Sequence, residues 1–445
     1  MEQDMTRGNP LSVIFMFTLP LAIGNIFQQL YNMADTIIVG RFVGADALAA
    51  VGSTGTIMFL LNGFAQGITA GFSVLTAQRF GAVKQSVTNG ILLSIIGAIL
   101  LTVLGCAIMD PLLHLMNTPD DIFDMAYTYI SLISLGMIAN VFYNLFSSYL
   151  RAVGNSKAPL FFLVFSACLN VGLDLFFIVV LKMGVAGAAW ATNLSQAISA
   201  LLCIVYIYCK VPALVPEKKH WRLTAGDTRY QMQMGIPMAL QFAITSSGTM
   251  IMQSAINLFG SEAVAAYTAA CKVHSLLTQG MVAMGQTMAV YSGQNYGKGD
   301  YGRIRAGVKA ALIIEFIYSV VSAVAVSLLL GVTLGLFFSG DVDLTAMMPW
   351  ARTYITICTL FYIPLSTIFI FRNTMQGCGY GFLPMMGGVV ELVARMLVAM
   401  IAMRVHSYAL SCFCDPAAWI SAGLFTGVSY LFVMKKIKAT LSPKG

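Results

Sequence analysis

Long apolar runs alternate with short polar segments along the whole chain. A run of about 20 apolar residues is long enough to cross the hydrocarbon core of a membrane as a helix. The pattern predicts twelve such helices, at residues 11–40, 50–78, 88–113, 125–150, 158–181, 186–210, 229–258, 264–295, 306–338, 345–376, 382–405 and 415–435. An all-α integral membrane protein is therefore expected.

Composition agrees with this prediction. The chain has 445 residues, of which 58% are hydrophobic and 10% charged, and its mean hydropathy is +0.81. Soluble domains carry roughly 25% charged residues, so a water-soluble fold is excluded. The nine cysteines are scattered and match no zinc or disulfide spacing.

Basic residues are concentrated in alternate loops. Lys and Arg crowd the loops that share a side with the N-terminus, including Arg372 and the polar segment 211–228, whereas the opposite loops keep only Arg41, Lys182 and Arg404. Cytoplasmic loops carry the excess of Lys and Arg, so both termini are expected in the cytoplasm. The net charge of +7 then reflects membrane topology, and no nucleic-acid partner is expected.

The two halves of the chain repeat each other. "FVGADALAAV" (42–51) returns as "FGSEAVAAY" (259–267), Pro20 returns as Pro237 and Pro159 as Pro384, at offsets of 217 and 225 residues. We predict two six-helix bundles related by a pseudo-two-fold axis along the membrane normal, namely an N-terminal lobe (1–210), a cytoplasmic linker (211–228) and a C-terminal lobe (229–445). Substrate sites in such folds lie near mid-membrane at the repeat interface.

Two carboxylates lie within the predicted membrane-spanning helices of the first half. At 1.5 Å per residue, Asp35 and Asp174 both fall about 9 to 12 Å inside the external boundary. Asn170 shares a helix face with Asp174, and Thr192 lies at a similar depth on the next span. These oxygen-bearing groups suit Na⁺, and a close carboxylate pair equally suits a shared proton. The alternative is that each acid is hydrogen-bonded separately and has a structural role.

The second repeat lacks this acid pair. At the repeat offsets, Asp35 falls on Met252, Asn170 on Arg395 and Asp174 on Ala399. Glu391 and Arg395 are spaced to form an ion pair within one helix. Glu391 could instead face the cavity and meet a cationic substrate. We expect Lys272 and His274 to be buried and Glu315 to be interfacial. Lys272 could answer Glu391, a pairing that the sequence leaves open.

At this point the sequence resembles a known family. The duplicated twelve-span layout, Pro20, "NMADTIIVGRFVGADALAAVG" (32–52), and "NVGLDLFFI" (170–178) with Thr192 are similar to the multidrug and toxic compound extrusion family of cation-coupled antiporters. The resemblance implies two lobes that alternate between inward- and outward-open states, with a cation site at Asp35, Asn170, Asp174 and Thr192. Some members use an acid in span seven, and here residues 235–259 contain none.

The resemblance also sets the functional expectation. We expect a monomeric multi-pass protein of the bacterial plasma membrane that contacts lipids and exports amphipathic, often cationic, organic compounds in exchange for Na⁺ or H⁺, without another cofactor. Candidate substrate-cavity residues are Gln28, Tyr31, Asn32 and Glu391. A flippase for lipid-linked precursors is the alternative, although it would need a strongly basic cavity. An intramembrane enzyme is disfavoured because no H-E-x-x-H motif or nucleophile–base set occurs.

Overall fold

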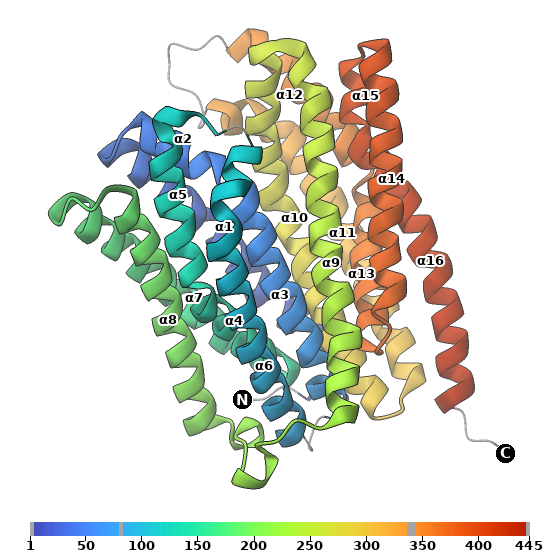
Figure 1. The fold of residues 1–445 in the computed structure, drawn as a ribbon. Helices are drawn as coiled ribbons and strands as arrows, with labels where there is room; N and C mark the ends of the chain where they lie inside the picture. Colours follow the sequence, from blue (N-terminus) through green and yellow to red (C-terminus); the bar gives the residue numbers. More distant parts are fainter. Residues whose placement is uncertain (1–3, 80–82, 117, 336–343, 442–445) are drawn as a thin grey trace. The chain divides into compact units, whose positions relative to one another are not determined.

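The protein is helical throughout the part that the computed structural model describes, residues 4–79, 83–116, 118–335 and 344–441 (Figure 1). The helices of the first half are α1 (Pro10–Phe42), α2 (Ala45–Ser53), α3 (Gly55–Gln78), α4 (Lys84–Leu115), α5 (Asp120–Leu135), α6 (Met137–Ala152), α7 (Lys157–Asp174), η1 (Leu175–Val180) and α8 (Gly184–Lys210). After the short helices η2 (Pro212–Leu214) and η3 (Lys218–His220), the second half comprises α9 (Ala225–Ile256), η4 (Asn257–Phe259), α10 (Gly260–Gly297), α11 (Tyr301–Gly335), α12 (Leu344–Thr359), α13 (Tyr362–Gly377), α14 (Phe382–Val405), α15 (Tyr408–Cys412) and α16 (Cys414–Leu441).

Every predicted membrane span corresponds to a long helix or a bent helix pair. Eight described helical segments are long and apolar enough to cross a membrane, and two bent pairs, α5–α6 and α12–α13, bring the number to ten. The pairs bend by 46° and 48°. The two remaining spans, α9 and α10, have 32 and 38 residues but do not reach the same apolarity. The twelve-helix prediction is confirmed.

The chain divides into two compact units, and the division runs through two helices. Unit 1 is built mainly from Ile23–Ala239, and unit 2 from Met5–Ala22 together with Leu240–Gly445. Both boundaries lie directly after an intrahelical proline, Pro20 in α1 and Pro237 in α9. Proline removes a helical hydrogen bond and favours a kink. Each of these helices therefore passes from one unit to the other next to a turn that lacks a backbone hydrogen bond.

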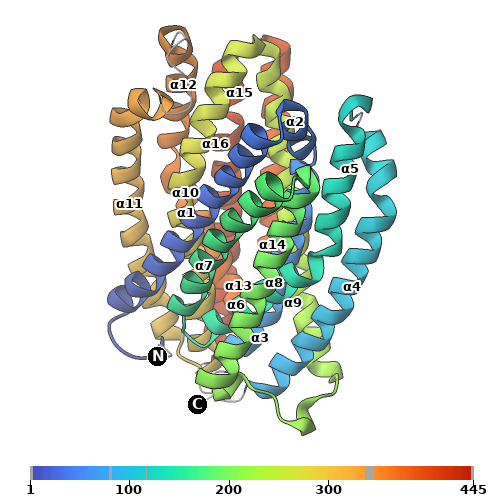
Figure 2. The same cartoon turned by 90° about the vertical axis from the view of Figure 1, so that its left-hand side faces the viewer.

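The same packing scheme occurs inside both units. In unit 1, α3 packs on α6, α7 on α8, α6 on α8, and α4 on α5 (Figure 2). In unit 2, the corresponding neighbours are α10 with α13, α14 with α16, α13 with α16, and α11 with α12. The internal repeat of the sequence is therefore a repeat of the fold.

The first half of α9 is held to unit 1 by close backbone packing against α3. A Cβ atom at Gly67 would lie 2.7 Å from the Ala239 Cα atom, and one at Gly71 would collide with the backbone of Gly235. Glycine therefore permits an approach that no other residue allows at these positions.

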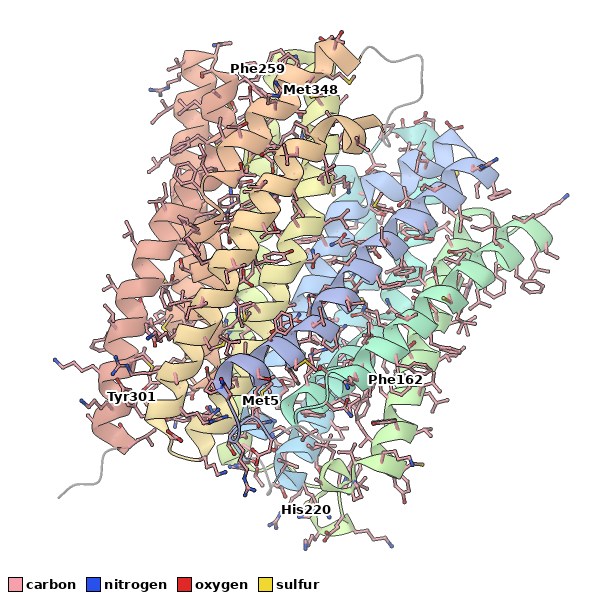
Figure 3. All side chains as sticks on the ribbon, turned by 180° about the vertical axis from the view of Figure 1, so that it is seen from behind. Met5, Phe162, His220, Phe259, Tyr301 and Met348 are labelled. Carbon is pink, nitrogen blue, oxygen red and sulfur yellow. The ribbon has the colours of Figure 1, made fainter. Side chains whose placement is uncertain are left out.

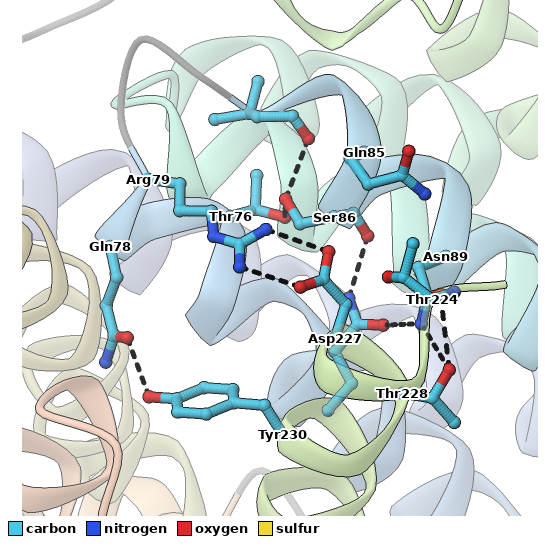
Figure 4. Close-up of polar contacts among 12 residues, drawn as sticks. Thr76, Gln78, Arg79, Gln85, Ser86, Asn89, Thr224, Asp227, Thr228 and Tyr230 are labelled. Atoms are coloured by element: carbon cyan, nitrogen blue, oxygen red, sulfur yellow. Dashed lines mark hydrogen bonds and ion pairs between the residues drawn. The ribbon is translucent and has the colours of Figure 1, made fainter. Parts of the chain in front are cut away.

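Polar contacts extend this attachment beyond the end of α3 (Figure 4). Arg79 donates to both carboxylate oxygens of Asp227, at 2.9 and 2.8 Å. The fully buried Gln231 donates to the carbonyl oxygens of Ser86 (2.8 Å) and Phe72 (3.2 Å). The start of α9 is thus fixed by an ion pair and by satisfied buried hydrogen bonds.

The start of α1 is anchored to unit 2 in a comparable way. Gln294 accepts from the Met5 backbone N–H at 3.0 Å, and Arg303 donates to the carbonyl oxygens of Met5, Arg7 and Gly8. Met5 and Tyr301 accordingly lie at one end of unit 2, whereas Phe259 and Met348 lie at the other (Figure 3). The last turns of α16 pack near Ile304, at the same end as Met5.

Candidate functional site

Asp35 and Asp174 are brought together in unit 1. Asp35 lies on the part of α1 that belongs to unit 1. Asp174 is the last residue of α7 and has an exposed fraction of 0%. Their carboxyl groups lie close enough to interact electrostatically. The Oδ1 atom of each residue is buried and has no partner in the described structure. Two contacting carboxylates repel each other unless a proton or another cation lies between them.

Asn170 and Thr192 complete the group. The Asn170 amide, oriented so that donors face acceptors, donates to Asp174 Oδ2 at 3.0 Å and accepts from the Thr192 backbone N–H at 3.1 Å. The Thr192 hydroxyl lies 3.5 Å from the same amide. α7 packs directly on α8, so the depth match that the sequence predicts is a spatial contact.

Two tyrosines adjoin the carboxyl pair. Tyr31, one helical turn before Asp35, lies beside Thr192 and close to both carboxyl groups. Tyr129 of α5 is buried and lies close enough to Asp35 and Asp174 to interact with them electrostatically. The sequence predicts Tyr31 in the substrate cavity but does not predict Tyr129. Tyr129 lies in an apolar stretch, where no nearby charged residue indicates its depth in the membrane.

The helix containing Asp174 changes its geometry at this residue. Leu175–Val180 follows as a π-helix, a rare form that occurs mostly as a local distortion and frequently at functional sites. The wider turn reorients the backbone next to the carboxylate. The corresponding helix of unit 2, α14, continues to Val405 without a π-helical segment.

The remaining candidate cavity residues differ in their burial. Gln28 and Asn32 are exposed on α1, whereas Glu391 in unit 2 is only 6% exposed. Arg395 contacts Glu391 at 3.1 Å and Asp415 at 2.8 Å, and Arg372 lies 3.8 Å from Glu391. The structure thus contains the Glu391–Arg395 ion pair and enlarges it to four charged residues.

The structure corrects one expectation about charged residues in the second half and adds to two others. Arg372 is counted above with the basic loop residues, although it falls inside the predicted span 345–376, and it lies in α13 and is buried. Glu315, expected at the membrane interface, lies within α11 and is 2% exposed. Lys272 is exposed rather than buried. Position along a span gives depth but does not give the direction in which a side chain points.

Comparisons with known proteins agree with this architecture. A family model described as MatE matches residues 20–176 and 237–401, one match in each repeat. A protein of Bacillus subtilis called probable multidrug resistance protein YpnP is 30% identical over 308 residues, covering 68% of each chain.

Solved structures match nearly the whole chain. A crystal structure of a MATE protein in complex with MaL6 has a TM-score of 0.89 at 22% identity, covering 98% of this chain and 99% of that one. A transporter of the MOP superfamily from Pyrococcus furiosus has a TM-score of 0.90 at 22% identity, covering 98% of both chains. These similarities show the fold.

Proposed function

Because the chain belongs to the MatE family, whose members compared above include a multidrug resistance protein and transporters, we propose that it is a secondary active antiporter. It exports drugs or other amphipathic organic compounds in exchange for inward Na⁺ or H⁺ by alternating access. The observation that carries this proposal is the grouping of Asp35 and Asp174 with Asn170 and Thr192. No other arrangement in the described part of unit 1 places two carboxyl groups together inside the membrane.

The carboxyl pair supplies the coupling. With a cation bound, the pair is close to neutral, and without one it holds repelling negative charges in a poorly solvated position. A ligand shifts a conformational equilibrium only by its different affinity for the two states. A site that is tolerable only when loaded therefore favours one conformation when occupied and another when empty.

The group offers ligands to either coupling ion. The carboxylate oxygens of Asp35 and Asp174 and the amide oxygen of Asn170 suit Na⁺, and the carboxyl pair suits a shared proton. Na⁺ and pH gradients applied separately distinguish the two ions.

The orientation in the membrane follows from the distribution of charge. The end of unit 2 that holds Met5 and the last turns of α16 also carries Lys298, Arg303 and Lys435. Basic residues mark the cytoplasmic side. We therefore place both ends of the described chain in the cytoplasm of a cell whose plasma membrane contains this protein.

Purified protein in liposomes tests this function. Vesicles loaded with a fluorescent organic dye would receive an inward Na⁺ gradient or an inward pH gradient, applied separately, and dye efflux would be followed. Wild-type protein should export dye with at least one gradient. Asp35→Asn and Asp174→Asn should each abolish gradient-driven efflux without lowering the yield of inserted protein, because an amide beside the one remaining carboxyl group removes the repulsion between two like charges on which coupling depends.

Asp124→Asn is the matched control, since Asp124 is an exposed acid near the start of α5. It should export dye at the wild-type rate. Efflux by either site variant at the wild-type rate would contradict the coupling role. Translocation of a lipid-linked precursor without any dye export would favour the flippase alternative.

A further inference from the structure

We propose that the segment between the two repeats binds an anionic phospholipid at the basic rim of unit 1, which the proposed orientation places at the cytoplasmic leaflet. The binding surface, which we call the linker patch, consists of Lys218, Lys219, Trp221, Arg222 and Leu223. All five side chains are exposed. This interaction is independent of the compound that the protein transports and of the cation that drives transport.

The backbone of the linker patch is fixed by side chains of α4. Gln85 donates to the carbonyl oxygens of His220 at 3.3 Å and Arg222 at 2.9 Å. Asn89 accepts from the Thr224 backbone N–H at 2.9 Å (Figure 4). A segment that only joins two repeats needs no such attachment, because a flexible polar linker serves this purpose. The side chains between these bonds therefore project from a backbone that is held in place.

The linker patch follows the end of a membrane-spanning helix. The exposed apolar face of α8 reaches Tyr208, and Lys210 is the last residue of that helix. Directly after it, Val211 and Leu214 are buried in a cluster to which the start of α4 contributes. Figure 3 shows His220 at the end of unit 1 where α8 ends. Aromatic and basic residues in this position mark the boundary between hydrocarbon and headgroups.

Trp221 and Leu223 give the linker patch an apolar component. Their side chains are 53% and 48% exposed, and they flank Arg222 in the sequence. The attached backbone keeps them out of the protein core. Tryptophan is enriched at membrane interfaces, where its ring lies among the headgroups. An apolar and a cationic group thus alternate over three residues, as contact with both the acyl and the phosphate region of a lipid requires.

The acids next to the linker patch are already paired. Glu217 accepts from Lys84 at 2.6 Å and from Lys219 at 2.8 Å. Lys219 and Lys84 hold the pKa of the Glu217 carboxyl at about 2, so this group stays ionised and engaged. Asp227 accepts from both terminal nitrogens of Arg79. Neither acid is available to neutralise a further basic residue.

An excess of positive charge remains. Lys210, Lys218, Arg222 and Arg229 form no ion pair within the described part of the chain, and Asp4, an acid of the N-terminal segment in unit 1, also has a partner. Anionic lipids attract basic residues close to the membrane surface. The excess charge therefore favours an anionic headgroup beside Lys218 and Arg222.

The combination of groups defines the ligand. The guanidinium of Arg222 can bind phosphate oxygens with two parallel hydrogen bonds, and Lys218 adds a second positive charge. Phosphatidylglycerol brings a phosphate without a cation of its own, whereas the choline of phosphatidylcholine already neutralises its phosphate. A free phosphate would satisfy the basic residues but leave Trp221 and Leu223 uncovered.

Thermal melting of the purified protein in detergent, with phospholipid added to the micelles, tests the proposal. Phosphatidylglycerol should raise the melting temperature of the wild type, and phosphatidylcholine at the same mole fraction should raise it clearly less. The double variant Lys218→Gln/Arg222→Gln should need an about tenfold higher mole fraction of phosphatidylglycerol for half of the rise. Both side chains are exposed, so the variant should fold normally. An unchanged dependence on phosphatidylglycerol would overturn the proposal.

Two further variants separate a formed site from diffuse attraction. Lys157→Gln removes an exposed basic residue at the start of α7 and should behave like the wild type. Gln85→Ala keeps every charge but releases the backbone of the linker patch, and it should weaken the effect of phosphatidylglycerol. An equal loss in Lys157→Gln, or no loss in Gln85→Ala, would contradict a site built by the linker.

Fluorescence quenching distinguishes a lipid from a soluble phosphate. Phosphatidylglycerol with brominated acyl chains should quench part of the tryptophan fluorescence of the wild type, and Trp221→Phe should lose this part. Glycerol phosphate should leave the melting temperature unchanged. Equal quenching in the wild type and Trp221→Phe would contradict contact with the lipid, and a full rise in melting temperature with glycerol phosphate would show a soluble ligand instead.

Discussion

Arg395 occupies in the second repeat the position that Asn170 has in the first, at an offset of 225 residues. In unit 1 two carboxyl groups meet and need a mobile cation. In unit 2 the guanidinium of Arg395 lies between Glu391 and Asp415, at 3.1 and 2.8 Å. The second repeat thus holds a cation that is covalently part of the protein and cannot be exchanged. Under the proposed mechanism, this difference confines coupling to unit 1.

Stability measurements on the four-residue charge group should reveal its pairing. Glu391→Gln leaves Arg372 without a counter-charge in a buried position, and breaking a buried ion pair costs about 3 to 5 kcal/mol. The double variant Glu391→Gln/Arg372→Gln restores neutrality and keeps the Arg395–Asp415 contact. It should melt at a higher temperature than Glu391→Gln alone.

The double variant Glu391→Gln/Arg395→Gln should melt at a lower temperature than Glu391→Gln/Arg372→Gln. It leaves Asp415 without its ion-pair partner Arg395, which lies 2.8 Å away in the wild type. Glu262→Gln, in the exposed first turn of α10, is the control and should melt like the wild type. Equal melting temperatures for Glu391→Gln and both double variants would contradict this pairing.

Individual residues were predictable from the sequence where depth alone decides their role. Asp35, Asn170, Asp174 and Thr192 share a level, and the rise per residue of a helix is enough to show it. Asp415 as a partner of Arg395 was not predictable, because their contact joins α14 to α16 through lateral packing. Tyr129 was not predictable either, because its approach to Asp35 and Asp174 also depends on how helices pack side by side.

At the level of elements, the helices were predictable because hydrocarbon requires long apolar segments with internally satisfied backbones. The short helices α2 and α15 and the bends at Gly136 and at 360–361 were not predicted. These features depend on how a helix end packs, which hydrophobic runs do not record. The lower apolarity of α9 and α10 had a signal, namely their many Ser, Thr and Gln residues.

The contact between α3 and α9 yields a prediction about helix packing. Gly71→Ala places a methyl group against the Gly235 backbone, and overpacking of this kind costs about 1 to 3 kcal/mol. The variant should melt at a lower temperature. Gly97→Ala is the control, because a Cβ atom at Gly97 meets nothing within 4 Å. Alanine favours helix by about 1 kcal/mol relative to glycine, so this variant should be at least as stable as the wild type.

Opposite signs for the two alanine variants would identify packing as the cause. A Gly71→Ala protein as stable as Gly97→Ala would show that α3 and α9 separate at little cost. Thermal melting in detergent, followed by loss of monodisperse protein, measures both.

For the whole molecule, the charge of the substrate decides how the membrane potential acts on transport. Export of a monoanion in exchange for one monovalent cation moves two positive charges inward, whereas export of a monocation moves none. A potential of about 100 mV is worth roughly 2.3 kcal/mol per charge. An inside-negative potential should therefore strongly increase the export of a monoanionic sulfonate dye.

Liposomes in which valinomycin and a K⁺ gradient set the potential would provide this measurement. Export of the sulfonate dye should rise with the potential at constant ΔpH, and export of ethidium should change little. A response of the same size for both dyes would contradict a fixed one-for-one exchange of anion against cation.

The division of α1 and α9 between the two units has a consequence for ancestry. The first part of α9 belongs to unit 1, and the first part of α1, within Met5–Ala22, belongs to unit 2. The first helix of each sequence half therefore begins in the unit that is built mainly from the other half. A six-helix forerunner encoded by a single repeat would have completed its fold only as a swapped homodimer. Fusion of two such copies would turn this reciprocal exchange into a single continuous chain.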